Sequence, residues 1–520
     1  MAPRVWSDQQ QQIFRWFASG TGNLVVRARA GTGKTTTIVE ALSHAPEKRI
    51  LLCAFNKRIA TDLQGKLTNP AAEAATLHSV GFAAVRQYWE RTRIDDKGAR
   101  KEHLARQACG DKVPDALVRL VAKLHTMGRE MAAAATDWRE LRPLAFAHDC
   151  VPDEEWADDG YDTDWVCARA IDAMNLAANV RPTATGIDFA DMLFLPVRNK
   201  WLRPKYDLIV VDECQDMNET QLLIAQGVAK GRVVVVGDDK QAIYGFRGAD
   251  SGSLDRLKTE LKAQELGLTT TYRCGKAIVQ EAQRLVPDFL AAPSNGEGRI
   301  ETIPVTQLAA ACAVGDFVLS RKNAPLATIA LRILRAGKRA KIEGKDIGAG
   351  LRALVGKLSK GKATGSMPQF LAKLTTWETR EVERASKSGD QTAEARIERV
   401  RDQAETIRAL ADGLSGVPEL QARIDDLFSD SGGPRVICSS VHRAKGLEAE
   451  RVFVLADTLL RELPCRCKHW AGVHDSGSGC SQCACKHYAE DAARKQEEQN
   501  IEYVAITRAK DTLVWVDGLP

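Results

Sequence analysis

The segment ARAGTGKT, Ala28 to Thr35, limits the possible folds of this chain more than any other feature. It follows a β-branched run at Asn23 to Val26 and precedes the helix-like TTTIVEAL. In such a strand, loop and helix, Gly31 and Gly33 let backbone N–H groups approach phosphates, and Lys34 reaches the β- and γ-phosphates. The usual first glycine of the pattern is replaced by Ala28. The predicted nucleotide site comprises Ala30, Gly31, Thr32, Gly33, Lys34, Thr35 and Thr36.

A second polar segment, DECQD at Asp212 to Asp216, follows the strand-like run YDLIVV. Parallel sheets place ligand-binding residues at the carboxyl ends of their strands. Asp212 suits the Mg²⁺ shell together with the Thr35 hydroxyl, and Glu213 suits orientation and deprotonation of an attacking water. The alternative is an acidic helix N-cap. The two segments together predict a site for ATP and Mg²⁺.

Short apolar, β-branched runs recur in two blocks of the chain. Continuous apolar strands of this kind are typical of parallel sheets covered by helices on both faces. Two stretches rich in helix-forming residues, about 88–184 and 350–431, lie between the strand-rich blocks. At 520 residues the chain exceeds one ordinary hydrophobic core. We therefore expect an α/β protein with two parallel-sheet lobes, each with a helical insertion. The expected strands lie at 23–26, 49–55, 206–211, 232–237, 316–320, 435–441, 451–456 and 512–516.

The overall net charge of +5 is too weak to identify a nucleic-acid binder. The segment from Arg321 to Lys362, however, contains twelve Lys or Arg residues and only two acidic residues. This local excess of positive charge suits either binding to a phosphate backbone or a solvated helix face. The run Asp149 to Asp164 holds eight acids and no base, and we expect a solvated loop there. The N-terminus is polar, and no apolar run is long enough to span a bilayer, so we expect an intracellular protein without a membrane partner, in the cytoplasm, nucleoid or nucleus.

Three further segments go beyond a generic ATPase: VVGDDKQAIYGFRGA (235–249), VHRAKGLE (441–448) and EEQNIEYVAITRAK (497–510). Together with the two sites above they resemble the UvrD/Rep family of superfamily-one DNA helicases, in family order from Gln10 to Lys510. FNKRIATDL (55–63) and TLHSVG (76–81) resemble the F-box DNA helicases in particular. No F-box segment is evident before Trp6, so the resemblance extends only to the helicase portion.

The resemblance implies a P-loop fold of two RecA-like lobes. The first lobe would comprise residues 1–88 and 185–275, interrupted by a helical insertion at 89–184. The second would comprise 276–349 and 433–520, interrupted by a helical insertion at 350–432 and carrying a Cys/His-rich insert at 463–490.

The resemblance also implies nucleotide contacts at matching positions. Gln10 would bond the adenine edge, Tyr272 would stack on the base and Glu448 would bond the ribose. Arg273 and Arg508 would reach the γ-phosphate from the second lobe and stabilise charge in the transition state. With Lys34 and Glu213, they would make hydrolysis depend on closure of the lobes.

Single-stranded DNA is the track that the resemblance implies. Gln241 would sense the γ-phosphate and link it to the DNA site. Tyr244 and Phe246 would stack on successive bases, which suits a motor that accepts any sequence. Other family positions lining the same groove are matched by Phe55, His78, Arg247 and His442.

The expected function is an ATP-dependent DNA helicase that moves 3′ to 5′ on single strands and acts at junctions of single- and double-stranded DNA. Only Asp511 to Pro520 follow Lys510, where longer family members continue into a strand-separating hairpin. Translocation is therefore the firmer expectation. The alternatives are a translocase that removes bound proteins from single strands, and an ATP-gated clamp on nucleic acid. Glu213, Arg273 and Arg508 together argue against the clamp.

A Cys/His-rich segment, Cys465 to His487, departs from the family pattern. Its C-x-C and C-x-x-C spacings fit a tetrahedral Zn²⁺ site in a reducing compartment. An iron–sulfur cluster and free thiols are the alternatives. The favoured zinc ligands are Cys465, Cys467, Cys480 and Cys483, with Cys485, His469 and His487 as competitors.

Overall fold

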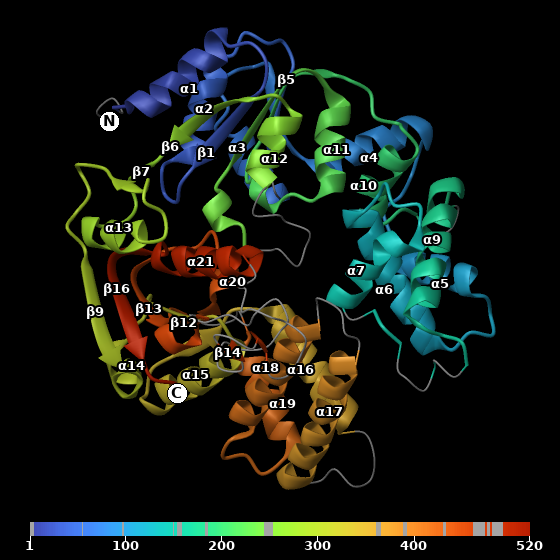
Figure 1. The fold of residues 1–520 in the computed structure, drawn as a ribbon, viewed down its shortest axis with the longest axis vertical. Coiled ribbons are helices and arrows are strands. Elements are labelled where there is room, and N and C mark those ends of the chain that lie inside the picture. The colour runs from blue at the N-terminus through green and yellow to red at the C-terminus, as the bar shows by residue number, and fades with distance from the viewer. Residues whose placement is uncertain are drawn as a thin grey trace. The chain divides into compact units, whose positions relative to one another are not determined.

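The computed structural model describes residues 5–520 except 55, 96–97, 149, 153–155, 157–158, 183–185, 244–252, 360–365, 388–392, 430–432, 461–473, 476–478 and 481–491. The chain divides into two compact units. The first comprises Met1–Ala28 and Gly33–Leu268, and the second comprises Arg29–Thr32 and Thr269–Pro520. Each unit contains one six-stranded sheet with helices around it (Figure 1). The predicted α/β class is confirmed.

The sheet of the first unit has the order β3-β2-β4-β5-β1-β6, and every neighbouring pair is parallel. Its residues alternate between two apolar layers: Leu24 and Val26 of β1 lie in one layer, and Val25 lies in the other. Both faces are therefore covered, which explains why the central strands are apolar without interruption. The strands are β1 (Leu24–Ala28), β2 (Ile50–Ala54), β3 (Ala72–Thr76), β4 (Tyr206–Val211), β5 (Ala229–Gly237) and β6 (Gln264–Leu268).

The helices of the first unit fall into two groups, one covering the sheet and one forming the predicted insertion. The insertion has its own apolar core from α5, α6, α7 and α9. The helices are α1 (Asp8–Ser19), α2 (Lys34–Ser43), α3 (Lys57–Gln64), α4 (Leu77–Tyr88), α5 (Ala99–Cys109), α6 (Asp115–Met131), α7 (Trp138–Ala147), α9 (Thr163–Asn179), α10 (Phe189–Arg198), α11 (Glu219–Val228) and α12 (Ser253–Glu260), with 3₁₀ turns η1 (Cys214–Asp216) and η2 (Asp239–Gln241).

A buried ion-pair network joins this insertion to α10. The Arg129 guanidinium lies 2.6 Å from Asp191 and 2.7 Å from Asp188, and Arg100 also pairs with Asp191. Arg100, Arg129 and Asp191 are almost fully buried. Loss of one partner would leave an uncompensated buried charge, so the network makes the packing of these helices specific.

The sheet of the second unit has the order β11-β12-β10-β13-β16-β9 and is also parallel throughout. Two short two-stranded sheets, β7-β8 and β14-β15, accompany it. All eight predicted strands are present across the two units. The strands of the second unit are β7 (Thr270–Thr271), β8 (Leu290–Ala291), β9 (Arg299–Pro304), β10 (Phe317–Ser320), β11 (Ala340–Ile342), β12 (Val436–Ser440), β13 (Ala449–Leu455), β14 (His474–Asp475), β15 (Gly479–Cys480) and β16 (Ala509–Asp517).

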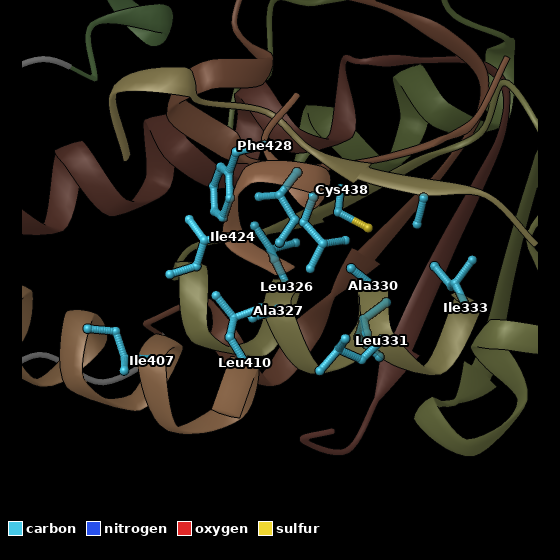
Figure 2. Packing of buried hydrophobic residues seen from close by; sticks show 14 of the residues in the cluster. Leu326, Ala327, Ala330, Leu331, Ile333, Ile407, Leu410, Ile424, Phe428 and Cys438 are labelled. Atoms are coloured by element: carbon cyan, nitrogen blue, oxygen red, sulfur yellow. The ribbon is translucent and has the colours of Figure 1, made fainter. Parts of the chain in front are cut away.

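One continuous apolar cluster joins this sheet to the helical insertion of the second unit. Figure 2 shows α15 residues such as Leu326 and Ala330 packed with Leu410, Ile424 and Phe428 of the insertion. The insertion is thereby anchored on the sheet. The helices are α13 (Lys276–Gln283), α14 (Val305–Ala311), α15 (Asn323–Arg335), α16 (Lys345–Leu358), α17 (Met367–Lys387), α18 (Ala393–Ala411), α19 (Val417–Leu427), α20 (Val441–Ala444) and α21 (Ala492–Ile506), with the 3₁₀ turn η4 (Ala456–Thr458).

Several cations of the basic segment 321–362 are used within the second unit. Arg321 pairs with Glu498 at 3.0 Å, and Arg335 pairs with Asp412 at 3.0 Å. The Lys338 ammonium donates to three backbone carbonyls around Cys312. For these side chains the contacts favour a structural role over phosphate binding. Within the described part of the chain, we find no helix long and apolar enough to cross a membrane.

Candidate active site

The phosphate loop joins β1 to α2 through two glycines in left-handed conformations. Gly31 has φ 66° and Gly33, the N-cap of α2, has φ 74°. Residues that carry a side chain rarely adopt these backbone conformations. A Cβ on Gly31 would also lie 2.6 Å from Thr271 Oγ1. No side chain of the described residues caps the first turn of α2. Its N–H groups are therefore available to an anion, as the sequence predicts.

Lys34 lies between the two predicted acidic side chains. Its Nζ is 2.6 Å from Glu213 Oε1 and 3.5 Å from Asp212 Oδ1. Burial opposes the charged form of the ammonium, but the carboxylates of Glu213 and Asp212 outweigh burial and raise the pKa of Lys34. Burial also raises the pKa of Asp212, and Lys34 counteracts this rise. The lysine thus stays charged at physiological pH.

Asp212 and Glu213 follow β4 directly and differ in their contacts and backbone conformation. The Thr35 hydroxyl donates to Asp212 Oδ2 at 3.3 Å, so the two predicted Mg²⁺ ligands are adjacent. Glu213 has φ 55°, a left-handed conformation that is uncommon for a residue with a side chain. Such strain persists where the surrounding structure imposes it, often at functional sites.

Gln215, for which no role was predicted, holds Glu213 in place. Its Nε2 donates to Glu213 Oε2 at 2.6 Å, and its Oε1 accepts from the Asp238 N–H at 3.2 Å. Gln215 is fully buried. Its place in the DECQD motif was the available signal, but the sequence did not show which atom it contacts.

The donor set fits Mg·ATP. An uncapped helix N-terminus and an ammonium group suit the phosphates, and a hydroxyl beside a largely buried carboxylate suits a hard cation. These groups come from the loop after β1 and from the end of β4, which lie at the same edge of a parallel sheet. The structure therefore brings Lys34, Thr35, Asp212 and Glu213 together.

Gln10 and Gln241 lie in the same unit, each engaged by neighbouring side chains. The Gln10 amide donates to Thr37 Oγ1 at 2.9 Å, and its oxygen accepts from the Ser7 N–H at 3.0 Å. The Gln241 amide donates to Asp238 Oδ2 at 2.8 Å. Asp238 thus links Gln241 to the Gln215 that holds Glu213.

The second unit holds Tyr272, Arg273, Glu448 and Arg508. Arg273 Nε lies 2.6 Å from Glu448 Oε2, and Lys510 Nζ lies 2.9 Å from Glu448 Oε1. Partial burial of Glu448 opposes ionisation, but Lys510 and Arg273 outweigh it and lower the pKa of the carboxyl. Lys510 was not predicted; its position in ITRAK was the only sequence signal.

Arg508 differs from Arg273 in its environment. Its guanidinium is buried and donates to the carbonyls of Val504 and Leu447, both at 3.0 Å. Burial, together with the charge of Arg273, lowers the pKa of Arg508 to about 10. Arg273 is 21% exposed, so of the two guanidiniums it is the more accessible.

Arg29 to Thr32 of the phosphate loop group with the second unit. Within this unit, the Gly31 carbonyl accepts from the Tyr272 N–H at 2.9 Å, and the Ala30 N–H donates to the Tyr503 hydroxyl at 3.1 Å. The Tyr272 side chain is 45% exposed, which suits stacking on a base. The Tyr503 contact was not predicted.

Two of the predicted DNA-contacting residues are described. His78 lies on α4, and His442 lies on α20. The His78 ring contacts Phe189, which is 58% exposed, with 6.3 Å between ring centroids. Phe189 was not predicted, although an aromatic residue directly after the N-cap Asp188 was a visible signal in the sequence. The remaining predicted DNA contacts, Phe55, Tyr244, Phe246 and Arg247, lie outside the described residues.

Most of the predicted zinc ligands also lie outside the described residues: Cys465, Cys467, His469, Cys483, Cys485 and His487. For Cys480 only the backbone is described, in an antiparallel pair of β14 and β15 that sets His474 opposite Cys480. The part of the chain with described side chains contains no group of three or more His, Cys, Asp or Glu residues that could hold a metal ion. The zinc hypothesis is therefore untested by the structure.

Comparison with known proteins covers both units. Residues 6–262 match the UvrD/REP helicase N-terminal domain, and residues 366–516 match the UvrD-like helicase C-terminal domain. F-box DNA helicase protein 1 of Schizosaccharomyces pombe is 25% identical over 95% of this chain and 56% of its own length. DNA helicase II of Haemophilus influenzae is 24% identical over 52% of this chain and 39% of its own length. ATP-dependent DNA helicase Rep of Salmonella typhimurium is 25% identical over 51% of this chain and 41% of its own length.

The chain spans about half the length of the curated relatives that it matches. With both domain types in family order, the chain belongs to the UvrD/Rep family of helicases.

Proposed function

We propose that this protein is an ATP-dependent DNA helicase that translocates on single-stranded DNA. The observation that carries the proposal is the cluster of Lys34, Asp212 and Glu213 beside the uncapped start of α2. The names of the relatives, which are DNA helicases, support the choice of DNA as the track. DNA-stimulated ATP hydrolysis and strand displacement by the purified chain test it together.

The residues of the first unit divide the work of hydrolysis. Lys34 and the N–H groups around Gly31 and Gly33 bind the phosphates. Thr35 and Asp212 would hold Mg²⁺, which neutralises phosphate charge when bound. Glu213, held by Gln215, orients the attacking water and accepts its proton. The Lys34–Glu213 ion pair must open as phosphates take up Lys34, which frees the Glu213 carboxylate for that task.

The second unit supplies positive charge and nucleotide contacts in the same proposal. Arg273 stabilises the charge that develops in the transition state, and Glu448 bonds the ribose. Lys510 holds Glu448 ionised, as the 2.9 Å contact supports. Arg508 is assigned to the γ-phosphate by the family motif, and its burial makes it structurally important as well.

For the DNA track, the family motif assigns stacking to Tyr244 and Phe246. His78 and the exposed Phe189 ring add an aromatic surface on α4 and α10. Stacking contributes roughly 1–3 kcal/mol per base and accepts any sequence. A protein that tracks single strands needs this tolerance.

Direction is the first prediction. We expect unwinding of a 3′-tailed duplex with ATP, and little unwinding of a 5′-tailed duplex, because the resemblance of the motifs to the UvrD/Rep family implies movement 3′ to 5′ on the gripped strand. A strand-displacement assay on 3′-tailed, 5′-tailed and forked duplexes measures it. Efficient unwinding of only the 5′-tailed duplex would contradict the assignment. ATP hydrolysis without displacement of any duplex, but with removal of a bound protein, would instead identify a translocase.

Zinc content is the second prediction. We propose that Cys465 to His487 binds Zn²⁺, because a segment so rich in Gly, Ser and Cys has little apolar surface to order itself. We expect stoichiometric zinc by elemental analysis of the purified chain, and its loss when Cys465 and Cys467 are both replaced by Ser. Replacement of Cys109 by Ser is the control, since that thiol lies in the helical insertion of the first unit. Protein without zinc would end this hypothesis, and stoichiometric iron would favour a cluster.

A further inference from the structure

A cavity of about 590 Å³ lies in the first unit, away from the phosphate loop. It is lined where β2, β4 and β5 begin, by residues such as Arg49, Tyr206 and Lys230. Because these strands run parallel to β1, their amino ends lie at the opposite edge of the sheet from the loop that follows β1. The cavity is therefore separate from the proposed ATP site.

The charges around this cavity are strongly unbalanced. Five exposed cations line it, with one carboxylate, that of Asp207; the cations are Lys48, Arg49, Arg203, Lys205 and Lys230. Asp207 lies 3.6 Å from the Lys230 ammonium, and Lys205 lies 3.5 Å from Glu73. Lys48, Arg49 and Arg203 pair with no carboxylate among the residues that the structure describes. Three cations are thus available to an anionic partner.

Much of the cavity lining is apolar, and one wall is stiffened by aromatic rings. Val80, Ala83, Ala84 and Val228 contribute aliphatic surface. Trp201, which also lines the cavity, stacks on Tyr88 with 4.8 Å between ring centroids. The Tyr88 hydroxyl accepts a hydrogen bond from Arg203 at 2.7 Å, so this guanidinium is held at the rim. The cavity therefore combines a fixed cation with an apolar interior.

This combination identifies the chemistry of the occupant. A nucleic-acid backbone would satisfy the cations but has no apolar group to fill the hollow, and single-strand grooves offer aromatic platforms more than aliphatic ones. A peptide with acidic residues around one large apolar side chain would satisfy both, because apolar anchors at interfaces fill pockets while charges at the rim select the partner.

We propose that this cavity, lined by Arg49, Arg203 and Trp201, docks an acidic peptide segment of a partner protein through one buried apolar side chain. The proposal is independent of helicase activity, since it concerns the edge of the sheet opposite the phosphate loop. It assigns to this surface the recruitment of the motor by an acidic partner.

Fluorescence anisotropy with the full chain tests the proposal. The probe is a fluorescein-labelled peptide, Gly-Asp-Glu-Asp-Phe-Asp-Glu-Asp. We expect saturable binding that weakens as the salt concentration rises. We also expect binding to weaken about tenfold when Ala replaces Phe in the peptide, because the buried ring contributes apolar contact area. We expect Arg203→Glu to weaken binding about tenfold or more, because it places like charges together.

Matched variants separate docking from general effects. Arg119→Glu makes the same charge change at an exposed position on α6, outside the cavity, and is expected to leave binding unchanged. Ala83→Phe fills the hollow without changing charge and is expected to weaken binding as much as Arg203→Glu. All three variants are expected to keep wild-type ATP hydrolysis stimulated by single-stranded DNA, which also shows that they fold.

Three outcomes would overturn the proposal. The first is no binding of the Phe peptide by the wild-type chain. The second is equal weakening by Arg119→Glu and Arg203→Glu, which would indicate unspecific charge attraction. The third is unchanged peptide binding by the Ala83→Phe variant, which would show that the hollow is not occupied. If the first outcome came together with loss of duplex or single-stranded DNA binding in Arg203→Glu, the surface would be a nucleic-acid contact instead.

Discussion

Replacement of Lys34 by Ala is expected to reduce ATP turnover to background, and Glu213→Gln is expected to do the same while keeping ATP bound. Lys34 is the largely buried cation beside Asp212 and Glu213, so its loss removes the charge that binds the phosphates and the cation that both carboxylates contact. Glu213 orients the attacking water and accepts its proton, so the Glu213→Gln variant loses the proton acceptor but keeps the groups that bind the phosphates. Phosphate release measures turnover, and a fluorescent ATP analogue measures binding.

The controls for this experiment come from the same unit. Lys112→Ala removes a lysine from an exposed position in the helical insertion, and Glu219→Gln makes the same change as Glu213→Gln at an exposed position of α11. Both are expected to hydrolyse ATP at the wild-type rate. Near-normal DNA-stimulated hydrolysis by Lys34→Ala or by Glu213→Gln would show that the active site is wrongly assigned.

The sequence was most informative where one physical requirement dominated. The central strands β2, β4 and β5 are buried on both faces of a sheet, so their residues had to be apolar throughout. Edge strands escaped prediction. β3 reads AEAAT, in which Ala and Glu are poor strand formers, and it exists because it pairs with β2. β9 is largely exposed and also lies at an edge.

The same contrast holds at the site. Gly31, Gly33 and Lys34 were predictable because phosphate binding demands a defined backbone and a cation at fixed spacing. Gln215 and Lys510 were not, because their roles depend on a contact with one atom of another residue. The left-handed conformation of Glu213 was not predictable either, since the residue type Glu gives no sign of such a backbone conformation. The spacing of residues along the chain does not give the distances between side chains that the fold brings together.

The second large effect is expected at Arg273. Replacement by Ala should lower kcat for ATP hydrolysis by roughly 10³- to 10⁵-fold, the range found for arginines that stabilise phosphoryl transfer. Arg273 is the better test of this role than Arg508, whose buried guanidinium binds two backbone carbonyls, so that its loss would also destabilise the second unit. Steady-state hydrolysis at saturating single-stranded DNA separates kcat from KM.

Two variants distinguish transition-state charge from a structural ion pair. Glu448→Gln weakens the partner of Arg273 without removing the guanidinium, and because Glu448 is assigned to the ribose we expect it to raise KM for ATP more than it lowers kcat. Arg284→Ala removes a partly exposed arginine that pairs with Glu281 and Glu502 in the same unit, and we expect wild-type kcat. If Arg273→Ala and Glu448→Gln lowered kcat equally, the pair would act as one structural unit. If Arg273→Ala kept wild-type kcat, transition-state charge would have to come from another residue, and Arg508 would be the next to test.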